Sequence, residues 1–328
     1  MSLQISVVIC TRNRPDTIGQ AVETVAGCDF SGFDIHIMDQ STDTKTQEIV
    51  GALSERYASK CDIVYHHLAK AGLSAAYNAG IRTTTGDLIA FTDDDVTVPS
   101  DWLSQIKATF DADADAELLY GQVCIPESVI PELQNGNHIP VLVFGEAKRF
   151  VPTEPYEPFG MGANMAIRRR LMERVGGFDE AMGGGGTLRS SQDHDFAYRT
   201  HRFGGTIALA PKVKVDHYGI RSEDQWPGTL MAYGFGDGAF YGKHIRCGDK
   251  RLVLTFAKLL IKFRLREVQR RLGKTPFKPD LHGRNLMAGY RAGLAFDIDP
   301  KYRLYQESSR GGKMSVTEAN AVTTATRK

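Results

Sequence analysis

The sequence predicts an α/β protein built on a doubly wound, mainly parallel sheet. Short β-branched, apolar segments lack strict alternation, as expected for strands buried on both faces. Each segment ends in a polar turn and is followed by an amphipathic helix, and this unit recurs at short spacing over the first hundred residues. A length of 328 residues allows one large domain or two ordinary ones.

The elements of the first part follow from this alternation. We expect, in order, a strand at 4–10, a helix carrying Ile18, Val22 and Val25, a strand at 33–38, a helix at 44–57, a strand at 63–66, a helix at 75–81 and a strand at 87–91. Polar turns at 11–14, 39–41 and 93–95 follow three of these strands. In doubly wound sheets ligands bind beyond the carboxyl ends of the strands, so these turns should converge on one crevice.

The turn at 93–95 consists of three adjacent aspartates directly after an apolar strand. Such a concentration of negative charge favours a hard divalent cation that also holds a phosphate ligand. The alternative is a solvated acidic turn or the N-cap of the helix expected near Trp102. A dinucleotide fold or P-loop is disfavoured because neither glycine motif follows the first strand.

The second part of the predicted body is mixed. We expect a strand at 117–125, an irregular segment at 126–158, a short helix at 168–175, a helix running from about 190 to 203, and strand segments at 206–210 and 213–215. Small residues at 160, 162 and 163 permit close approach of the backbone to a ligand. The glycine-containing segments 226–228 and 233–236 are expected to form a mobile loop over the site.

Taken in order, these fragments resemble the family 2 glycosyltransferases of the GT-A fold. The resemblance covers about residues 4–220 and rests on the strand and turn at 6–15, Asp39 with its neighbours, Gly72-Leu73-Ser74 with Asn78, the triplet at 93–95 with Pro99 and Trp102, Gly162-Ala163-Asn164-Met165, Gly176-Gly177-Phe178-Asp179, and Gln192-Asp193-His194-Asp195-Phe196 with Arg199. Two departures are Gln40 and Gln192, where the family often has acidic residues.

The resemblance implies roles for named residues on the donor side. It implies that the triplet holds Mn²⁺ or Mg²⁺ on the diphosphate of a nucleotide sugar, with Asp95 as main ligand and Asp93 or Asp94 near the ribose. His217 is either a third metal ligand, as in some relatives, or structural. Asp39 would read the edge of a uracil or thymine base. The remaining donor-site residues would be Thr11, Arg12, Arg14, Gly72 and Asn78.

On the acceptor side the resemblance implies that Asp193 is the general base. It would deprotonate the acceptor hydroxyl during a single displacement that inverts the anomeric carbon. Gly162, Ala163, Asn164 and Asp195 would contact the acceptor or the sugar, although Asp195 could instead cap the helix that follows. A Gln-x-x-Arg-Trp signature is not found, which favours transfer of one sugar over polymerisation.

The expected function is therefore metal-dependent transfer of a sugar from a UDP- or dTDP-sugar to a hydroxyl, possible acceptors being lipid-linked or cell-envelope glycans. The alternative is a catalytically silent module of the same fold that binds a nucleotide sugar or glycan. Five scattered cysteines, and no signal-like or bilayer-length apolar segment, predict a cytoplasmic protein, with peripheral attachment to the inner face of a membrane as an option.

Charge is distributed unevenly along the chain. Residues 243–274 hold eleven Lys or Arg against Asp249 and Glu267, whereas residues 1–242 carry about −12. The segment 251–272 is expected to be a basic amphipathic helix that either lies on an anionic membrane or packs on the catalytic body. The acidic body disfavours nucleic acid.

The expected division has four parts. Residues 1–115 form the nucleotide-sugar subdomain, 116–225 the acceptor and base subdomain, 226–307 a helical basic extension and 308–328 a disordered tail.

Overall fold

The computed structural model describes residues 3–156, 160–273 and 280–308, and the chain divides into two compact units. The first unit comprises residues 1–180 and 192–229, and the second comprises 181–191 and 230–328. The predicted disordered tail lies, apart from Ser308, outside the described residues. The functional division of the chain at residues 115, 225 and 307 stays a prediction.

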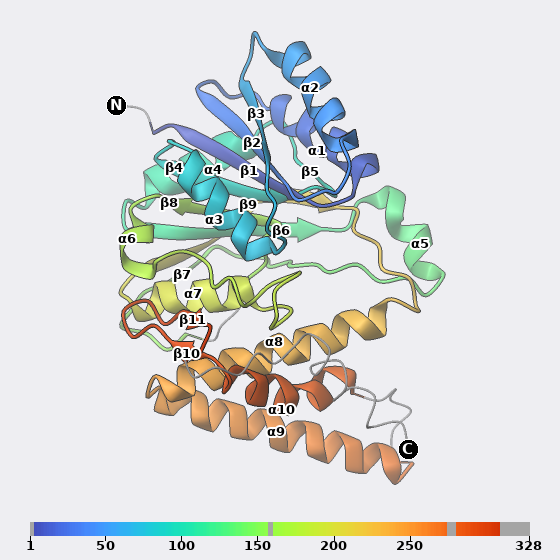
Figure 1. Cartoon of the computed structure of the whole chain (residues 1–328), viewed down its shortest axis with the longest axis vertical. Helices are drawn as coiled ribbons and strands as arrows, with labels where there is room; N and C mark the ends of the chain where they lie inside the picture. The colour runs from blue at the N-terminus through green and yellow to red at the C-terminus, as the bar shows by residue number, and fades with distance from the viewer. Residues whose placement is uncertain (1–2, 157–159, 274–279, 309–328) are drawn as a thin grey trace. The chain divides into compact units, whose positions relative to one another are not determined.

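The first unit contains a nine-stranded sheet in the order β3-β2-β1-β4-β8-β6-β9-β5, with β7 paired to β9 (Figure 1). Its strands are β1 (Ile5–Thr11), β2 (Phe33–Asp39), β3 (Asp62–His67), β4 (Leu88–Asp93), β5 (Val96–Thr97), β6 (Ala116–Cys124), β7 (Lys148–Phe150), β8 (Asn164–Arg168) and β9 (Thr206–His217). Strands β3, β2, β1 and β4 are parallel, and β8 runs antiparallel between β4 and β6. The sequence therefore predicted the sheet type correctly.

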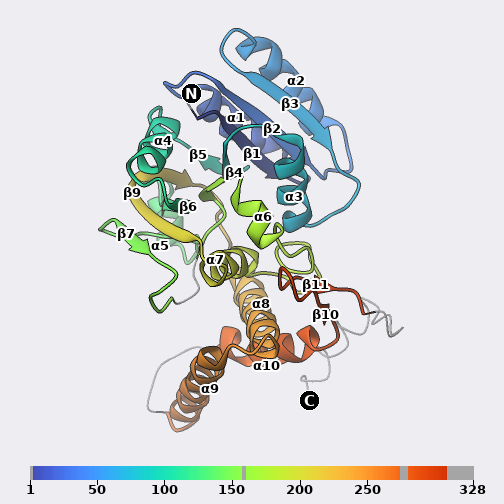
Figure 2. The ribbon, with the colours of Figure 1, turned by 90° about the vertical axis from the view of Figure 1, so that its left-hand side faces the viewer.

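Helices cover both faces of this sheet, which makes it doubly wound (Figures 1 and 2). They are α1 (Pro15–Ala26), α2 (Lys45–Tyr57), α3 (Leu73–Thr83), α4 (Trp102–Ala112), the 3-10 turn η1 (Glu127–Val129), α5 (Ile130–Gln134), α6 (Leu171–Val175) and α7 (Gln192–Arg202). One core cluster joins α1, α2 and α4 to the sheet, and the other joins α3, α6 and α7.

Strand β1 shows why the apolar segments lack alternation. Val7 and Ile9 belong to the first core cluster, whereas Val8 and Cys10 belong to the second. All seven residues of β1 are buried. Burial of one such aliphatic side chain stabilises the fold by about 1.5–3 kcal/mol, so both faces must be apolar.

The parallel register brings the polar turns to one edge of the sheet. In the strand pairs, Thr11 is opposite Asp39, and Cys10 is opposite Asp93. The three strands therefore end at the same level, and their turns meet there. This confirms the expected convergence.

The second unit is mainly helical. It contains α8 (Trp226–Arg246) from residue 230 onward, α9 (Lys250–Arg271), α10 (Leu281–Gly293) and the strand pair β10 (Asp297–Ile298) and β11 (Tyr305–Gln306). None of the described helices is both long and apolar enough to cross a bilayer.

The predicted mobile loop at 226–236 is wrong, because these residues form the start of α8. Its glycines serve close helix packing instead of turns. A Cβ at Gly234 would lie 2.0 Å from the carbonyl oxygen of His282, and one at Gly238 would lie 1.9 Å from that of Leu286. Only glycine lets the backbones of α8 and α10 approach this closely.

Candidate active site

The acidic triplet lies at the end of β4 and in the turn to β5. Thr11 Oγ1 donates a hydrogen bond to Asp94 Oδ2 at 2.6 Å. The guanidinium of Arg14 bridges two of the carboxylates, with Nη1 2.5 Å from Asp94 Oδ1 and Nη2 2.6 Å from Asp95 Oδ2. Thr11 is the last residue of β1 and Arg14 lies in the turn that follows it, so the ends of β1 and β4 build this part of the site.

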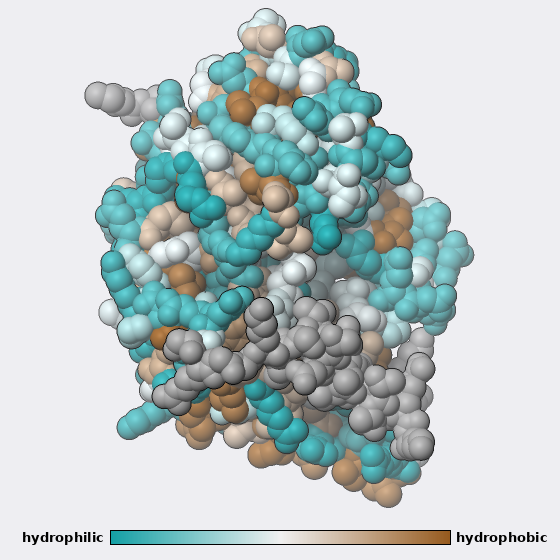
Figure 3. Space-filling view, in the orientation of Figure 1, coloured by the Kyte–Doolittle hydropathy of each residue, from teal (hydrophilic) through white to brown (hydrophobic). Residues whose placement is uncertain are grey.

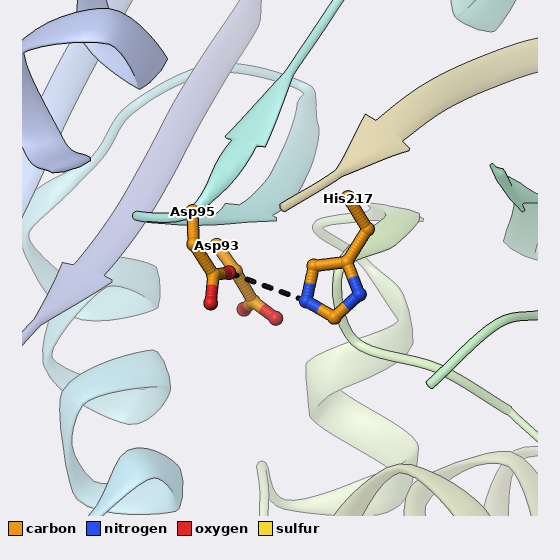
Figure 4. Close-up of side chains that lie close together, drawn as sticks. All are labelled: Asp93, Asp95 and His217. Carbon is orange, nitrogen blue, oxygen red and sulfur yellow. Dashed lines mark ion pairs between the residues drawn. The ribbon is translucent and has the colours of Figure 1, made fainter. Parts of the chain in front are cut away.

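His217 joins the triplet from the end of β9. Strand β9 pairs with β5, where His217 is opposite Val96. The imidazole Nδ1 lies 2.9 Å from the carbonyl oxygen of Pro140, and Nε2 lies 3.3 Å from Asp95 Oδ1 (Figure 4). A carbonyl only accepts, so Nδ1 carries a proton and Nε2 points at the carboxylates.

Burial and mutual repulsion shape the ionisation of the cluster. Burial, with the charge of Asp95, raises the pKa of Asp93 to about 7, and burial raises the pKa of Asp94 to about 6. Burial also disfavours the ionised form of Asp95. His217 and Arg14 favour that form more strongly, so they hold the pKa of Asp95 well below its usual range. Burial works to lower the pKa of His217, but Asp95, followed by Asp93 and the carbonyl of Pro140, raises it above its ordinary value.

These residues fit a divalent cation. One ligand atom from each of Asp93, Asp95 and His217 can be chosen so that all lie within 4.8 Å of one another. Three carboxylates exceed the two positive charges that Arg14 and a protonated His217 supply. Carboxylates suit Mg²⁺ and Mn²⁺, and an imidazole held by a backbone carbonyl is a typical metal ligand. The added nitrogen favours Mn²⁺ over Mg²⁺, which prefers oxygen.

Sequence reasoning missed Gly219, which makes room for this cluster. A Cβ at that position would lie 2.5 Å from His217 Nε2 and 2.6 Å from Asp95 Oδ2. Any larger residue would displace one of the two. A glycine two residues after the histidine is the only signal in the sequence, and alone it is weak.

A second part of the site is a pocket of about 510 Å³ at the ends of β2 and β3. It is lined by Arg12, Gln40, Ser41, Thr42, Asp43, Thr44, Gln47, Tyr65, His67, Leu68, Ala69 and Ala71. Asp39 lies fully buried beside it, where Oδ1 accepts from the Ser41 backbone N–H and Oδ2 accepts from the Tyr65 hydroxyl, each at 2.8 Å. Burial, followed by the bond to Asp39, raises the pKa of Tyr65 to about 12.

Asp193 lies in the first turn of α7 and is partly exposed. Its Oδ2 accepts the Gly162 N–H at 3.2 Å, and its Oδ1 accepts the His194 N–H at 2.9 Å. Desolvation raises the pKa of Asp193 above the ordinary aspartate value, although these hydrogen bonds work in the other direction. A carboxylate with a raised pKa is suited to accept a proton.

Tyr77 and Gly162 connect Asp193 to the metal-ligating cluster. The Tyr77 hydroxyl lies 3.5 Å from Asp93 Oδ1, and a Cβ at Gly162 would lie 2.5 Å from that hydroxyl. Gly162 therefore lies between Tyr77 and Asp193. We expected this glycine to admit a ligand, but the space that it leaves is taken by Tyr77.

The structure argues against ligand contacts by Asn164 and Ala163. Asn164 is fully buried; its Nδ2 donates to the carbonyls of Gln122 and Val213, and its Oδ1 accepts from Trp102 Nε1 at 3.0 Å. Ala163 is also buried, and its carbonyl accepts from the Thr92 hydroxyl. These residues fix β8 in the sheet, and no polar atom of the Asn164 side chain remains for a sugar.

Asn78 and Gly72 also make internal bonds. The Asn78 side chain bonds both the N–H and the carbonyl of Phe178, so it holds the turn after α6. The N–H and carbonyl of Gly72 are bonded by the side chain of Gln40, which also reaches the Lys70 carbonyl. Gln40, a departure from the family pattern, therefore holds the loop before α3.

Asp195 is engaged in an internal ion pair. It is fully buried and pairs with the equally buried Arg199, Oδ2 to Nε at 2.7 Å. Arg199 in turn donates to the carbonyls of Val175 and Gly177. This ion pair ties α7 to α6, so the geometry contradicts the expected contact of Asp195 with acceptor or sugar.

Comparison with known proteins decides the family. The model of "Glycosyl transferase family 2" matches residues 6–176, just over half of the chain. The chain belongs to this family. Curated relatives of this glycosyltransferase include the succinoglycan biosynthesis protein ExoM of Rhizobium meliloti, 27% identical over 65% of this chain, and the pre-mycofactocin glycosyltransferase of Mycobacterium tuberculosis, 27% identical over 70%. The matches span 66% and 46% of the lengths of those proteins.

Solved structures confirm the GT-A fold of this family 2 glycosyltransferase. The mannosyltransferase PcManGT from Pyrobaculum calidifontis, solved with GDP-Man and Mn²⁺, aligns with a TM-score of 0.57 and 18% identity over 99% of this chain and 80% of its own. S. aureus TarS 1-349, solved with UDP, aligns with a TM-score of 0.52 and 18% identity over 70% of this chain and 64% of its own. At this identity the likeness concerns the fold alone.

Proposed function

We propose that this glycosyltransferase moves a single sugar from a nucleotide diphosphate sugar to a hydroxyl acceptor with inversion at the anomeric carbon. The observation that supports this best is the short path of contacts from Asp93 through Tyr77 and Gly162 to Asp193. A cation-binding cluster and a carboxylate with a raised pKa thus border one region, as donor activation and acceptor deprotonation require.

The nucleotide would bind in the pocket beside Asp39. A carboxylate whose oxygens are held by Ser41 and Tyr65 still has lone pairs for an imide N–H, which uracil and thymine possess. This favours a UDP- or dTDP-sugar. Among proteins of this fold, TarS has been solved with UDP-GlcNAc and PcManGT with GDP-Man, so the fold alone leaves the base open.

The diphosphate would lie at Asp93, Asp95 and His217, which would hold Mn²⁺ or Mg²⁺. When bound, the cation would supply Lewis-acid stabilisation of the leaving nucleoside diphosphate. Arg14 would then release one of its carboxylates and turn its charge toward a phosphate oxygen, a partner that arginine binds well. Thr11 would keep Asp94 in place through its hydrogen bond.

Asp193 would act on the acceptor. As the acceptor oxygen attacks the anomeric carbon, its proton passes to a carboxylate oxygen of Asp193. The new bond joins that oxygen to the anomeric carbon, and the bond to the diphosphate oxygen breaks with its electron pair leaving on the nucleotide. One displacement without a covalent enzyme intermediate inverts the configuration.

The acceptor class that we favour is a lipid-linked or cell-envelope glycan, which the enzyme would meet as a peripheral protein at an anionic membrane. Two relatives carry lipid names: the beta-monoglucosyldiacylglycerol synthase of Synechocystis, 23% identical, and the glucosyl-dolichyl phosphate glucuronosyltransferase of Haloferax volcanii, 25% identical. These names guide the choice of acceptors for an assay.

The test is release of nucleoside diphosphate from a panel of nucleotide sugars, with and without Mn²⁺. We expect metal-dependent release from one donor, stimulated by its acceptor and lost in Asp95→Asn. The matched control is Asp29→Asn, an exposed aspartate of the first unit that does not line the nucleotide pocket. A donor that binds with metal but is never cleaved would instead support a silent binding module, and binding of no donor would overturn both functions.

A further inference from the structure

Helix α9 has two apolar faces, and among the residues that the structure describes only one of them packs within the second unit. Leu252 and Phe256 are buried, and the ring of Phe256 stacks on Tyr241 at 4.8 Å and on Tyr290 at 5.3 Å. Phe263, further along this face, lies 5.6 Å from His282. These contacts attach this face of α9 to α8 and α10, so this face is already packed inside the second unit.

The other apolar face points outward. It consists of five large aliphatic side chains with exposed fractions of 52–65%: Leu254, Ile261, Leu265, Val268 and Leu272, which follows the helix. At about 100° per residue these positions fall within roughly 60° of one another, opposite to Phe256 and Phe263. Figure 3 shows hydrophobic surface along the lower edge of the view, where Figure 1 draws α9.

Basic side chains border this outward stripe on both sides. By the same helical spacing, Lys258 and Lys262 lie on one side, and Arg264 and Arg271 lie on the other. All four are exposed. The helix carries eight basic residues and one acidic residue, Glu267, whose pKa is lowered by Arg270 and Arg284. An exposed aliphatic stripe between two rows of positive charge matches a surface that is apolar inside and anionic at its edge.

We propose that this face of α9 docks the protein on an anionic lipid surface, with its axis parallel to the membrane. The aliphatic side chains would enter the boundary between headgroups and acyl chains, while the lysines and arginines would contact lipid phosphates. The 22 residues of α9 give a docking edge of about 33 Å. The proposal deepens the proposed function, because it assigns contact with the membrane to one surface of the protein. It rests on the proposed function only for the nature of the acceptor.

The test is co-sedimentation of the full chain with vesicles of phosphatidylcholine, alone or mixed with phosphatidylglycerol. We expect binding to the anionic vesicles that weakens as salt is raised. Lys258→Gln with Lys262→Gln should weaken binding roughly 30-fold at low salt, from the attraction of each charge to the surface. Ile261→Ser with Leu265→Ser should weaken it at least about tenfold, even where the charges remain.

Two control variants alter the same chemistry elsewhere. Lys60→Gln with Lys212→Gln removes two exposed charges from the first unit, and Val141→Ser with Val143→Ser removes two exposed aliphatic side chains. Both should bind vesicles like the wild type. All eight substituted positions are solvent-exposed, so thermal unfolding should change little in any variant.

Equal binding by the α9 variants and their controls, or no binding to anionic vesicles at low salt, would overturn the proposal. A dimer in sedimentation velocity that Ile261→Ser with Leu265→Ser dissociates, without vesicle binding, would assign the face to a second copy instead. Donor turnover is measured without vesicles. Donor turnover without vesicle binding would therefore refute only the docking proposal. Vesicle binding without donor turnover would refute only the proposed reaction.

Discussion

Substitution of Asp193 by asparagine isolates the proton-transfer step. Asparagine keeps the shape of the side chain and one acceptor oxygen for the two backbone N–H groups, those of Gly162 and His194, that the carboxylate now binds. The other N–H would face an amide, at a cost of about 1–3 kcal/mol. The neutral side chain also removes the desolvation that raises the Asp193 pKa, which offsets part of this cost. We therefore expect Asp193→Asn to fold.

Its catalytic effect should be much larger than its effect on stability. Loss of a general base lowers kcat about 10²–10⁴-fold, which corresponds to roughly 3–5 kcal/mol of transition-state stabilisation. Donor binding should be unchanged, because the described hydrogen bonds of the Asp193 carboxylate go to the backbone N–H groups of Gly162 and His194 and not to the cation-binding residues. The assay is nucleoside diphosphate release at saturating donor and acceptor, paired with calorimetric titration of the nucleotide.

The dependence of activity on pH is a second test of Asp193 as the general base. The pKa of Asp193 is raised in the folded protein, so the ionised base accumulates only as pH rises through that value, and kcat/KM should rise with it. For stability the sign is opposite: a raised carboxyl pKa favours folding at low pH, and that contribution is lost as pH rises. A variant with kcat within tenfold of the wild type, or with the same acidic limb, would refute the assignment of Asp193.

Three further substitutions test other parts of the site. Gly219→Ala should weaken Mn²⁺ binding at least about tenfold while circular dichroism stays unchanged, because its Cβ would take space that the ligands occupy; unchanged affinity in a metal titration would contradict this. Tyr65→Phe removes the hydroxyl that holds Asp39, so UDP affinity measured by calorimetry should fall about 3–10-fold and the preference for UDP over GDP should become smaller. An unaltered preference would count against Asp39 as the residue that recognises the nucleobase. Asn164→Ala leaves the indole N–H of Trp102 and two backbone carbonyls without partners, which should lower the free energy of unfolding in urea by about 2–4 kcal/mol. Donor affinity, measured at urea concentrations below the unfolding transition, should be retained. Loss of donor affinity without loss of stability would restore Asn164 as a ligand residue.

The sheet and the position of the acidic triplet were predictable from the sequence for a simple physical reason. Strands such as Ile5–Thr11 are buried on both faces, so their apolar composition is nearly continuous and each polar turn marks a strand end. Parallel register then forces Thr11, Asp39 and Asp93 to one edge. The local sequence pattern and the geometry of a parallel sheet were together sufficient to predict where these residues lie.

Residues with internal partners were not predictable in the same way. Asn78 and Asn164 stand in motifs that resemble binding residues, yet each bonds backbone groups about 40 to 100 positions away, which no local pattern encodes. The glycines of α8 were misread for a related reason: the same residue permits a turn or a close helix contact, and the backbone of α10 decides between them. The sequence predicted the basic amphipathic helix at 251–272, but which of its apolar sides packs internally depends on Tyr241 and Tyr290 of other helices, which contact Phe256.

The most direct test of the central claim is calorimetric titration of UDP into the protein with and without Mn²⁺. The geometry of Asp93, Asp95 and His217 predicts tight binding only with Mn²⁺, abolished by Asp95→Asn and retained by Asp193→Asn. Binding that is independent of the metal, or equal in Asp95→Asn and wild type, would show that the carboxylate cluster is not the diphosphate site.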